Sequence, residues 1–525
     1  MQYMNKRKLP IGGVQTFSIL RKEYDVYIDK TQYVYDIASR YRVVFLSRPR
    51  RFGKSLLCST IKSVFKNERE LFCGLAISNT DWQWQEHPVI HIDLSLEDFT
   101  GANGAKALIA SLNRQLDNVC DVYNISVEET DLIGNRFAKI ITELSRKINK
   151  VVVVIDEYDN PLLSTINQEE LNNILREKLK GFYSILKGSD EYLRFVFITG
   201  ITKFAQITMF SGMNQPKDIS MMPEYCSICG ITQQELEENF APEINAYAEK
   251  YGGKEHCLKE LKDYYNGYRF TREKVSVYNP YGILNHFDND AVFMPYWSIS
   301  GTPSFALKYL EMKGINVVDI EDARMEAEKF ANYKDDSISL FPLLYQAGYL
   351  TISDYEERTG SYRLNYPNID VRKTFAEFLA SNYSEAQSIS ARSVSIEFVD
   401  ALLEGNLDEF MNLLKWYLHT VDYSLSSKIT EHYVEFAISN IINMLGLVCV
   451  NEAHTANGSM DSVIFTRNRI YIFEFKVDKP VETALRQIKK KEYALLYAKD
   501  GREIIKVGVV FSRELRNILD WEKVA

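Results

Sequence analysis

The run of four valines and one isoleucine at residues 151–155 constrains the fold of this chain more than any other feature. Residues branched at Cβ favour strands, and a run that is apolar at every position predicts a strand buried on both faces. The run is far shorter than the roughly 20 apolar residues that span a bilayer. We therefore predict a central strand of a parallel sheet, and no membrane partner.

Three similar runs flank this strand in the sequence, at 42–47, 88–95 and 194–201. Stretches with helical periodicity separate them, at 53–66, 103–118, 136–148 and 169–187. Strands that alternate with helices, joined by right-handed crossovers, form an α/β sandwich of three layers. We predict this core for residues 1–225.

The remainder of the chain divides into three further predicted parts. Residues 226–390 read as a helical and winged-helix-like region, since 341–368 has the pattern of a helix end, a strand, a polar turn and a second strand. Residues 391–425 read as a helical linker. Residues 426–525 read as a small α/β domain, with helices at 429–445 and 480–499 and strands near 447–452, 460–466, 470–477 and 505–511.

Length and composition set limits on function. At roughly 150 residues per domain, 525 residues predict several domains, and a net charge of −9 excludes a basic coat for nucleic acid. The seven cysteines show no framework spacing, which predicts a reducing cytoplasm. Cys226 and Cys229 form a lone C-x-x-C, which reads as buried thiols rather than as a metal site.

A phosphate-binding loop is predicted where the first strand meets the first helix of the core, in the sequence LSRPRRFGKS at 46–55. The backbone amides of Arg51, Phe52 and Gly53 would wrap the phosphates of ATP. Lys54 would neutralise the β- and γ-phosphates, and the Ser55 hydroxyl would ligate Mg²⁺. The usual loop begins with glycine, where this chain has Arg48, so a basic loop that merely contains GKS is the alternative.

The acids after the valine strand predict the second half of this site. Asp156 would hold the magnesium through water, and Glu157 would polarise the attacking water as the catalytic base. Thr199, or Thr202 three residues later, would sense the γ-phosphate, although a satisfied hydroxyl at a strand end fits equally well. Upstream, Asp29-Lys30-Thr31 borders either the nucleotide or a helix that Asp29 caps.

A second cluster of chemical groups is predicted near the C-terminus. Asp461 is followed 13 positions later by Glu474 and then by Lys476, a spacing that fits a hairpin. Alternation along the second strand puts Glu474 and Lys476 on one face with Phe475 behind them. Two carboxylates suit Mg²⁺ or Mn²⁺, and a nearby ammonium suits a phosphodiester, so the cluster predicts hydrolysis of nucleic acid.

Two neighbouring elements would complete this second site. Glu431 or Glu435, one turn apart on the preceding helix, would add a metal ligand, and Gln487 would brace the lysine or contact the DNA backbone. A solvated hairpin with ordinary salt bridges is the alternative. The charges of 426–525 nearly balance, so non-specific affinity for DNA should be modest.

These motifs together resemble a known family. SRPRRFGKSLL, VIDEYDNPL, YNGYRF, VYNPYGIL and YQAGYLTI are similar to the bacterial AAA-ATPase-like family, and GSMDSVIF, IYIFEFKVD and ALRQIKKKEYA resemble the PD-(D/E)XK nuclease superfamily domain often fused to it. The resemblance implies a P-loop NTPase core and a restriction-endonuclease-like C-terminal domain. It also implies that Lys54, Ser55, Asp156 and Glu157 serve the first site and that Asp461, Glu474 and Lys476 serve the second.

The sequence therefore predicts an ATP-driven switch that controls a metal-dependent nuclease on the same chain, with DNA favoured over RNA. One alternative is a nucleotide-gated scaffold or sensor whose nuclease-like domain binds nucleic acid or protein without cleaving it. Another keeps the nuclease and treats the first site as a structural nucleotide-binding element. A homo-oligomer is compatible with all three.

Overall fold

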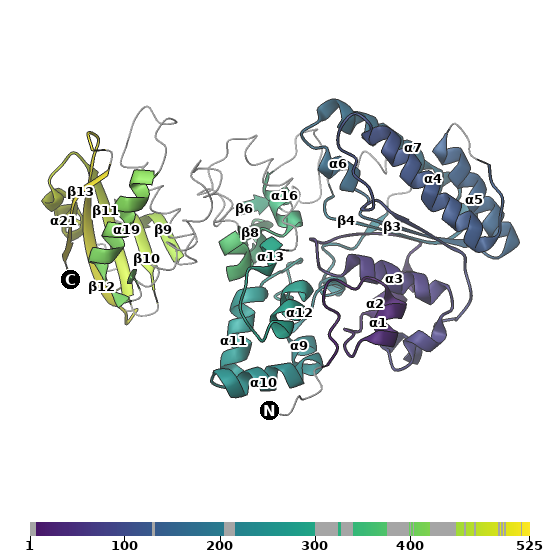
Figure 1. The fold of residues 1–525 in the computed structure, drawn as a ribbon, viewed down its shortest axis with the longest axis horizontal. Helices are drawn as coiled ribbons and strands as arrows, with labels where there is room; N and C mark the ends of the chain where they lie inside the picture. The colour runs from purple at the N-terminus through teal and green to yellow at the C-terminus, as the bar shows by residue number, and fades with distance from the viewer. Residues whose placement is uncertain are drawn as a thin grey trace. The chain divides into compact units, whose positions relative to one another are not determined.

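The computed structural model describes residues 7–128, 132–203, 216–299, 324–326, 340–374, 398, 401–402, 404–420, 448–455, 458–466, 469–491, 494, 497, 500–515 and 517–524 (Figure 1). The chain divides into two compact units, Met1–Asp370 and Val371–Ala525. No helix in the described ranges is both long and apolar enough to cross a membrane.

The first unit is built on a parallel five-stranded sheet in the order β2-β3-β4-β1-β5. The strands are β1 (Val43–Ser47), β2 (Val89–Asp93), β3 (Val151–Asp156), β4 (Leu193–Gly200) and β5 (Lys217–Asp218). The four predicted strands are confirmed. Only two residues of β5 pair with β1, which is too short a segment to leave a periodic signal in the sequence.

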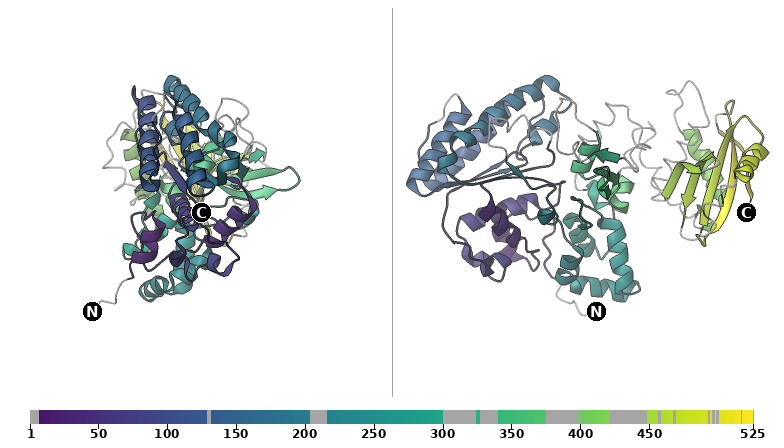
Figure 2. Two further views of the ribbon diagram at one scale, coloured as in Figure 1. Left: turned by 90° about the vertical axis from the view of Figure 1, so that its right-hand side faces the viewer. Right: turned by 180° about the vertical axis from the view of Figure 1, so that it is seen from behind.

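Helices cover both faces of this sheet, which confirms the predicted three layers. On one face, α4 (Gly104–Tyr123), α5 (Ile133–Lys147) and α7 (Glu169–Gly188) pack on a core that includes Val151, Val153 and Ile155. On the other lie α1 (Phe17–Glu23), α2 (Thr31–Arg40) and α3 (Lys54–Phe65), where Phe65 of α3 stacks on Phe195 of β4 at 5.5 Å between ring centroids. Figures 1 and 2 show the two helical layers from opposite sides.

The described residues after the sheet include the short helices α9 (Gln233–Asn239), α10 (Ala241–Tyr251), α11 (Lys254–Tyr265), α12 (Pro280–Asp288) and α13 (Tyr296–Ile299). Their core includes Leu9 and Val26, so the N-terminal segment is shared between the sheet layer and this helical part. Next come α16 (Leu340–Ala347) and a sheet of β6 (Arg324–Glu326), β7 (Thr351–Glu356) and β8 (Ser361–Asn365). The predicted helix, strand, turn and strand are thus present, while the winged-helix assignment stays a prediction.

The second unit contains a mixed sheet in the order β13-β12-β11-β10-β9. The strands are β9 (Val448–Thr455), β10 (Gly458–Phe465), β11 (Arg469–Val477), β12 (Glu503–Ser512) and β13 (Asn517–Val524). β11 pairs in parallel with β12 across the crossover helix α21 (Val481–Lys490), and the other pairs are antiparallel. The predicted helix at 429–445 lies outside the described residues.

The helix α19 (Leu407–Thr420) lies within residues 391–425, which the sequence predicts to be a helical linker. Its buried residues, among them Phe410 and Leu414, share a core with Phe473 and Phe475 of β11. On the opposite face of the sheet, Ile488 of α21 packs with Ile470 and Ile472. This stretch is therefore a structural layer of the C-terminal unit, where the sequence suggested a connection between units.

Candidate functional site

The loop between β1 and α3 presents the start of a helix to the carboxyl edge of the sheet. Gly53 is the N-cap of α3 and has a φ of 93°, in the left-handed region that favours glycine. Because glycine has no side chain to cap the helix, the amides of the first turn are left for another acceptor. Together with the helix dipole, they make this end of α3 suited to an anion such as phosphate.

Lys54, the first residue of α3, is almost fully buried at 3% exposure. Its Nζ donates to the carbonyl oxygens of Arg48, at 3.1 Å, and Pro49, at 3.2 Å, both within the loop. It also lies 3.1 Å from Oε1 of Glu157. The ammonium group therefore links the phosphate loop to Glu157, which are the two predicted halves of the site.

β4 lies between β1 and β3, so one strand separates the acidic motif from the strand that leads into the phosphate loop. Thr199 of β4 pairs with Leu46 of β1, and Ile198 pairs with Ile155 of β3. Because side chains alternate along strands, Asp156 and Thr199 both face the α3 layer. The intervening strand thus places the predicted sensor threonine between the loop and the acids.

Asp156, at the end of β3, lies in a place that disfavours its charge. Burial, followed by the neighbouring Glu157, raises the pKa of Asp156 to about 7, while a hydrogen bond from Ser55 and the charge of Lys54 act in the opposite direction. Among the described residues, Oε2 of Glu157 and Oγ1 of Thr199 are buried without a hydrogen-bond partner. Two adjacent carboxylates and a hydroxyl are oxygen donors of the kind that Mg²⁺ prefers, so these residues fit a cation.

Two side chains of the loop are occupied by packing. Arg48 is buried and donates to the carbonyl oxygens of Ser220, at 2.7 Å, and Tyr225, at 2.9 Å, so it ties the loop to the segment after β5. Phe52 is also buried, with its ring 4.7 Å from that of Tyr268. Only the backbone of Phe52 is available for phosphate. The guanidinium of Arg51, by contrast, is exposed and lies 5.2 Å from the ring of Tyr281.

A cavity of about 310 Å³ lies over the loop. Its lining includes the GKS residues, Glu157, the N-terminal segment at 10–15, and Tyr281 and Asn285 of α12. A second cavity of about 100 Å³ shares Pro10, Leu56 and Leu284 with it, and its lining is almost entirely apolar. A polar, cation-lined space beside an apolar one suits an amphipathic ligand such as a nucleotide.

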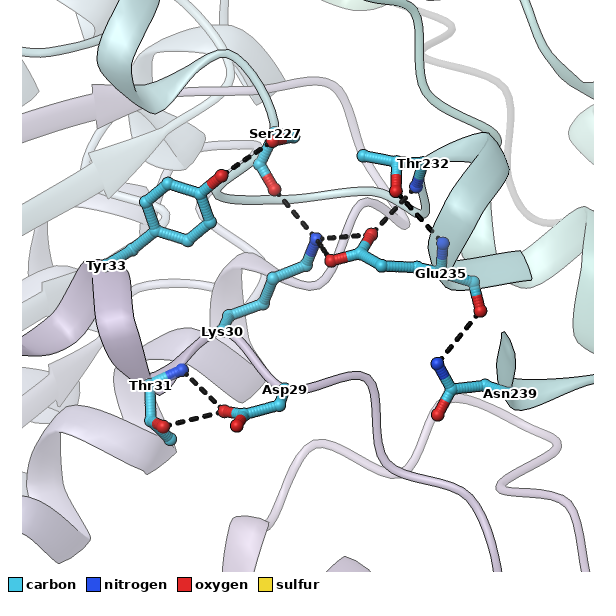
Figure 3. A network of polar contacts seen from close by, with 8 residues as sticks. All are labelled: Asp29, Lys30, Thr31, Tyr33, Ser227, Thr232, Glu235 and Asn239. Carbon is cyan, nitrogen blue, oxygen red and sulfur yellow. Dashed lines mark hydrogen bonds and ion pairs between the residues drawn. The ribbon is translucent and has the colours of Figure 1, made fainter. Parts of the chain in front are cut away.

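The Asp29-Lys30-Thr31 segment is used in structural contacts (Figure 3). Asp29 accepts hydrogen bonds from the backbone and hydroxyl of Thr31, and its other oxygen accepts from the amide of Ala76. Lys30, which lines the apolar cavity, donates to Ser227 and to both carboxylate oxygens of Glu235, at 2.6 and 2.8 Å. Glu235 belongs to the capping box of α9, so this partly buried ion pair joins the α2 layer to the helical part.

The second cluster lies on neighbouring strands of the C-terminal sheet. Lys476 Nζ is 2.8 Å from Oε1 of Glu474, and both side chains are buried. Phe475 points to the opposite, α19 face, as the predicted alternation requires. Oδ2 of Asp461 on β10 accepts from the backbone amide of Phe475 at 2.7 Å, which brings this carboxylate to the same point of β11.

The remaining residues predicted for this site are Gln487, Glu431 and Glu435. Gln487 lies half-buried on α21, which contacts β11 and β12. Gly508 of β12 pairs with Glu474, and a Cβ there would lie 3.1 Å from that of Ala484, so glycine permits α21 to pack closely. Glu431 and Glu435 lie outside the described residues. Within the described ranges, no group of three or more His, Cys, Asp and Glu is arranged to hold a metal ion.

The fold and these two clusters define a class: an α/β core with a phosphate-loop type of site, followed by a small α/β unit with an Asp, Glu and Lys cluster. Residues 10–210 match a family model described as Predicted AAA-ATPase, and residues 429–521 match one described as PD-(D/E)XK nuclease superfamily. A protein of Azotobacter chroococcum mcd 1, described as an uncharacterized protein in the vnfD 5' region, is 32% identical over 533 residues, which cover 99% of each chain.

This chain therefore belongs to the AAA-ATPase-like family and carries a C-terminal PD-(D/E)XK nuclease superfamily domain. The solved structure of the Aeropyrum pernix Orc1 protein in complex with DNA is 13% identical and covers 70% of this chain and 98% of its own. Its TM-score of 0.25 is too low to carry an argument about fold or function.

One buried acid in the first site was missed in the sequence. Asp159, three residues after Asp156, is fully buried and accepts hydrogen bonds from the end of β4. The signal that could have drawn attention to it is a third acid within four residues directly after an apolar strand.

Proposed function

We propose that the N-terminal unit binds ATP and hydrolyses it. The observation that carries this proposal is the convergence of Lys54, Glu157 and the uncapped first turn of α3 on one cavity. The polar cavity suits the triphosphate, and the adjoining apolar cavity suits the base. The scale is adequate, since cavities for small ligands are commonly about 300 to 1,000 Å³.

The residues of the chain would divide the work as follows. The amides from Arg51 to Ser55 hold the phosphate oxygens, and Lys54 turns from Glu157 and the loop carbonyls toward the β- and γ-phosphates. Ser55 and Asp156 hold Mg²⁺, which when bound neutralises charge on the phosphates. Glu157, released from Lys54, orients a water molecule and accepts its proton, while the Thr199 hydroxyl donates to the γ-phosphate or to that water.

ATP turnover by the purified full-length chain tests the proposal. Lys54→Ala should abolish turnover and weaken nucleotide binding, whereas Glu157→Gln should retain binding and lose turnover by about 10²-fold or more. Lys106→Ala, which removes an exposed lysine of α4, is the matched control and should behave as the wild type. Equal turnover by the wild type and Lys54→Ala would refute the proposal. Tight ATP binding without turnover would favour a structural nucleotide site.

A second activity is proposed for the C-terminal unit, namely metal-dependent cleavage of DNA. The observation that favours it is the buried Glu474–Lys476 pair beside Asp461. Burying an ion pair costs free energy, and this pair lies on β11, the central strand of its sheet, which favours a chemical role for it. Asp461 and Glu474 would hold Mg²⁺ or Mn²⁺, and Lys476 would neutralise a phosphodiester oxygen.

Nicking of supercoiled plasmid DNA with Mg²⁺ or Mn²⁺ tests this second activity. Asp461→Ala and Lys476→Met should abolish nicking, and Lys523→Met, at an exposed lysine of β13, should leave it intact. DNA binding without nicking under any metal would favour the scaffold alternative. If the first site controls the second, nicking by the wild type should respond to ATP, and this response should be lost in Lys54→Ala.

A further inference from the structure

We propose that Asp159 is a positioning residue of the ATPase site, which fixes the end of β4, and with it the Thr199 hydroxyl, against the Asp156–Glu157 turn. The inference rests on the proposed ATPase function and adds to it a residue that does not itself touch the nucleotide.

The carboxylate of Asp159 does not cap the helix that follows it. Asp159 is the N-cap of α6 (Asn160–Ser164), where an aspartate side chain usually accepts from an amide of the helix, but no such bond forms. Instead, Oδ1 accepts from the amide of Ile201 at 3.2 Å, and Oδ2 accepts from the amide and hydroxyl of Thr202 at 2.7 and 2.6 Å. The side chain is thus directed across the sheet edge to the segment that follows β4.

Tyr158 also holds this segment. Its amide donates to the carbonyl of Thr199 at 3.0 Å, and its hydroxyl donates to the carbonyl of Thr202 at 3.0 Å. Between them, Gly200 is so close that a Cβ would lie 2.4 Å from Oδ1 of Asp159 and 2.5 Å from the ring of Tyr158. Residues 199–202 are therefore clamped, and the position of the Thr199 hydroxyl is set by the residues that follow the catalytic acids.

The burial of an acid in this clamp argues for a functional reason, because taking a carboxylate out of water costs free energy. Three acids lie within four residues, and Asp159 is completely buried among them. Its carboxylate is used entirely in holding the segment after β4, through hydrogen bonds from the amides of Ile201 and Thr202 and from the Thr202 hydroxyl.

A functional reason for the clamp is found in Thr199, the residue whose position it fixes. Thr199 is fully buried, and within the described ranges its hydroxyl has no hydrogen-bond partner. An unused buried hydroxyl on the same face of the sheet as Asp156 is suited to a ligand, provided that it is held at the correct distance.

Steady-state ATP hydrolysis by Asp159→Asn, with binding of a fluorescent ADP analogue measured in parallel, tests the inference. Asparagine cannot accept at its amide nitrogen, so kcat should fall by at least about tenfold, the loss expected for one charged hydrogen bond. KM and ADP affinity should change by less than about twofold, because Asp159 does not touch nucleotide. Asp98→Asn is the matched control, since Asp98 makes the same bonds to Thr100 on an exposed loop.

The Thr202 pair tests the same clamp if Asp159→Asn does not fold. Thr202→Val removes the hydroxyl donor and should lower kcat, and Thr202→Ser should restore most of the lost turnover. An unchanged kcat in Asp159→Asn, or equal kcat values for Thr202→Val and Thr202→Ser, would overturn the inference while leaving the ATPase proposal intact. A wild type without turnover would overturn both.

Discussion

Lys30 offers a sharp test of how the first unit is held together (Figure 3). In Lys30→Met, the carboxylate of Glu235 loses its partner, and the carbonyl of Ser227 loses a donor. Removing one member of a fully buried pair costs about 3–5 kcal/mol. Because the Glu235 side chain is 22% exposed and keeps a hydrogen bond from the Thr232 amide, we expect about 2–3 kcal/mol.

Hydrogen exchange, followed by mass spectrometry in the full-length chain, measures this loss of stability separately for each helix. Peptides from α2 and α9 should exchange roughly 30-fold faster or more, because about 1.4 kcal/mol corresponds to a factor of ten. Glu235→Gln in the Lys30→Met background should recover part of the loss, since no unpaired charge is then left buried.

A second ion pair of α9 serves as a control that separates the effect of burial from the effect of charge. Lys254 forms an ion pair with Glu237 of α9, but these side chains are 54% and 37% exposed. Lys254→Met should therefore leave the exchange of α9 essentially unchanged. The reasoning fails if Lys30→Met behaves like Lys254→Met, or if Glu235→Gln adds a further full loss to Lys30→Met.

Three further predictions concern stability and are each read by urea unfolding. Burial lowers the pKa of His286 from 6.5 to about 4. As the pH falls, the unfolded state therefore binds a proton before the folded state does, so the free energy of unfolding is constant above pH 6.5 and decreases between pH 6.5 and pH 4. His286→Phe should remove this pH dependence, which is on the order of 3 kcal/mol, and an unaltered curve would contradict the prediction. Gly267 has a φ of 93°, and a Cβ there would lie 1.8 Å from the carbonyl oxygen of Pro367, so Gly267→Ala should cost at least about 2 kcal/mol. Phe410→Ala should cost about 3–5 kcal/mol in the C-terminal unit, because the ring is fully buried beside Phe398 and Phe473; a loss below about 1 kcal/mol would indicate that α19 is peripheral after all.

The order of strands and helices was predictable because each element has its own local pattern of apolar residues. The valine run at 151–155 and the three related runs have the composition of doubly covered strands, and the helices between them carry their own periodicity. The GKS motif at the start of α3 and the acids at the end of β3 follow from the same reading, since each lies where an element begins or ends.

Sequence by itself therefore determined which residues end strands and begin helices, and which of them carry charge. Tertiary structure alone decided their neighbours: that β4 enters between β1 and β3, that Lys30 meets Glu235, and that Asp159 turns from its own helix to β4. The reason is physical. Periodicity reflects which side of an element is buried, whereas pairings between residues 43 and 205 positions apart are chosen by the packing of the whole unit, which no local pattern records.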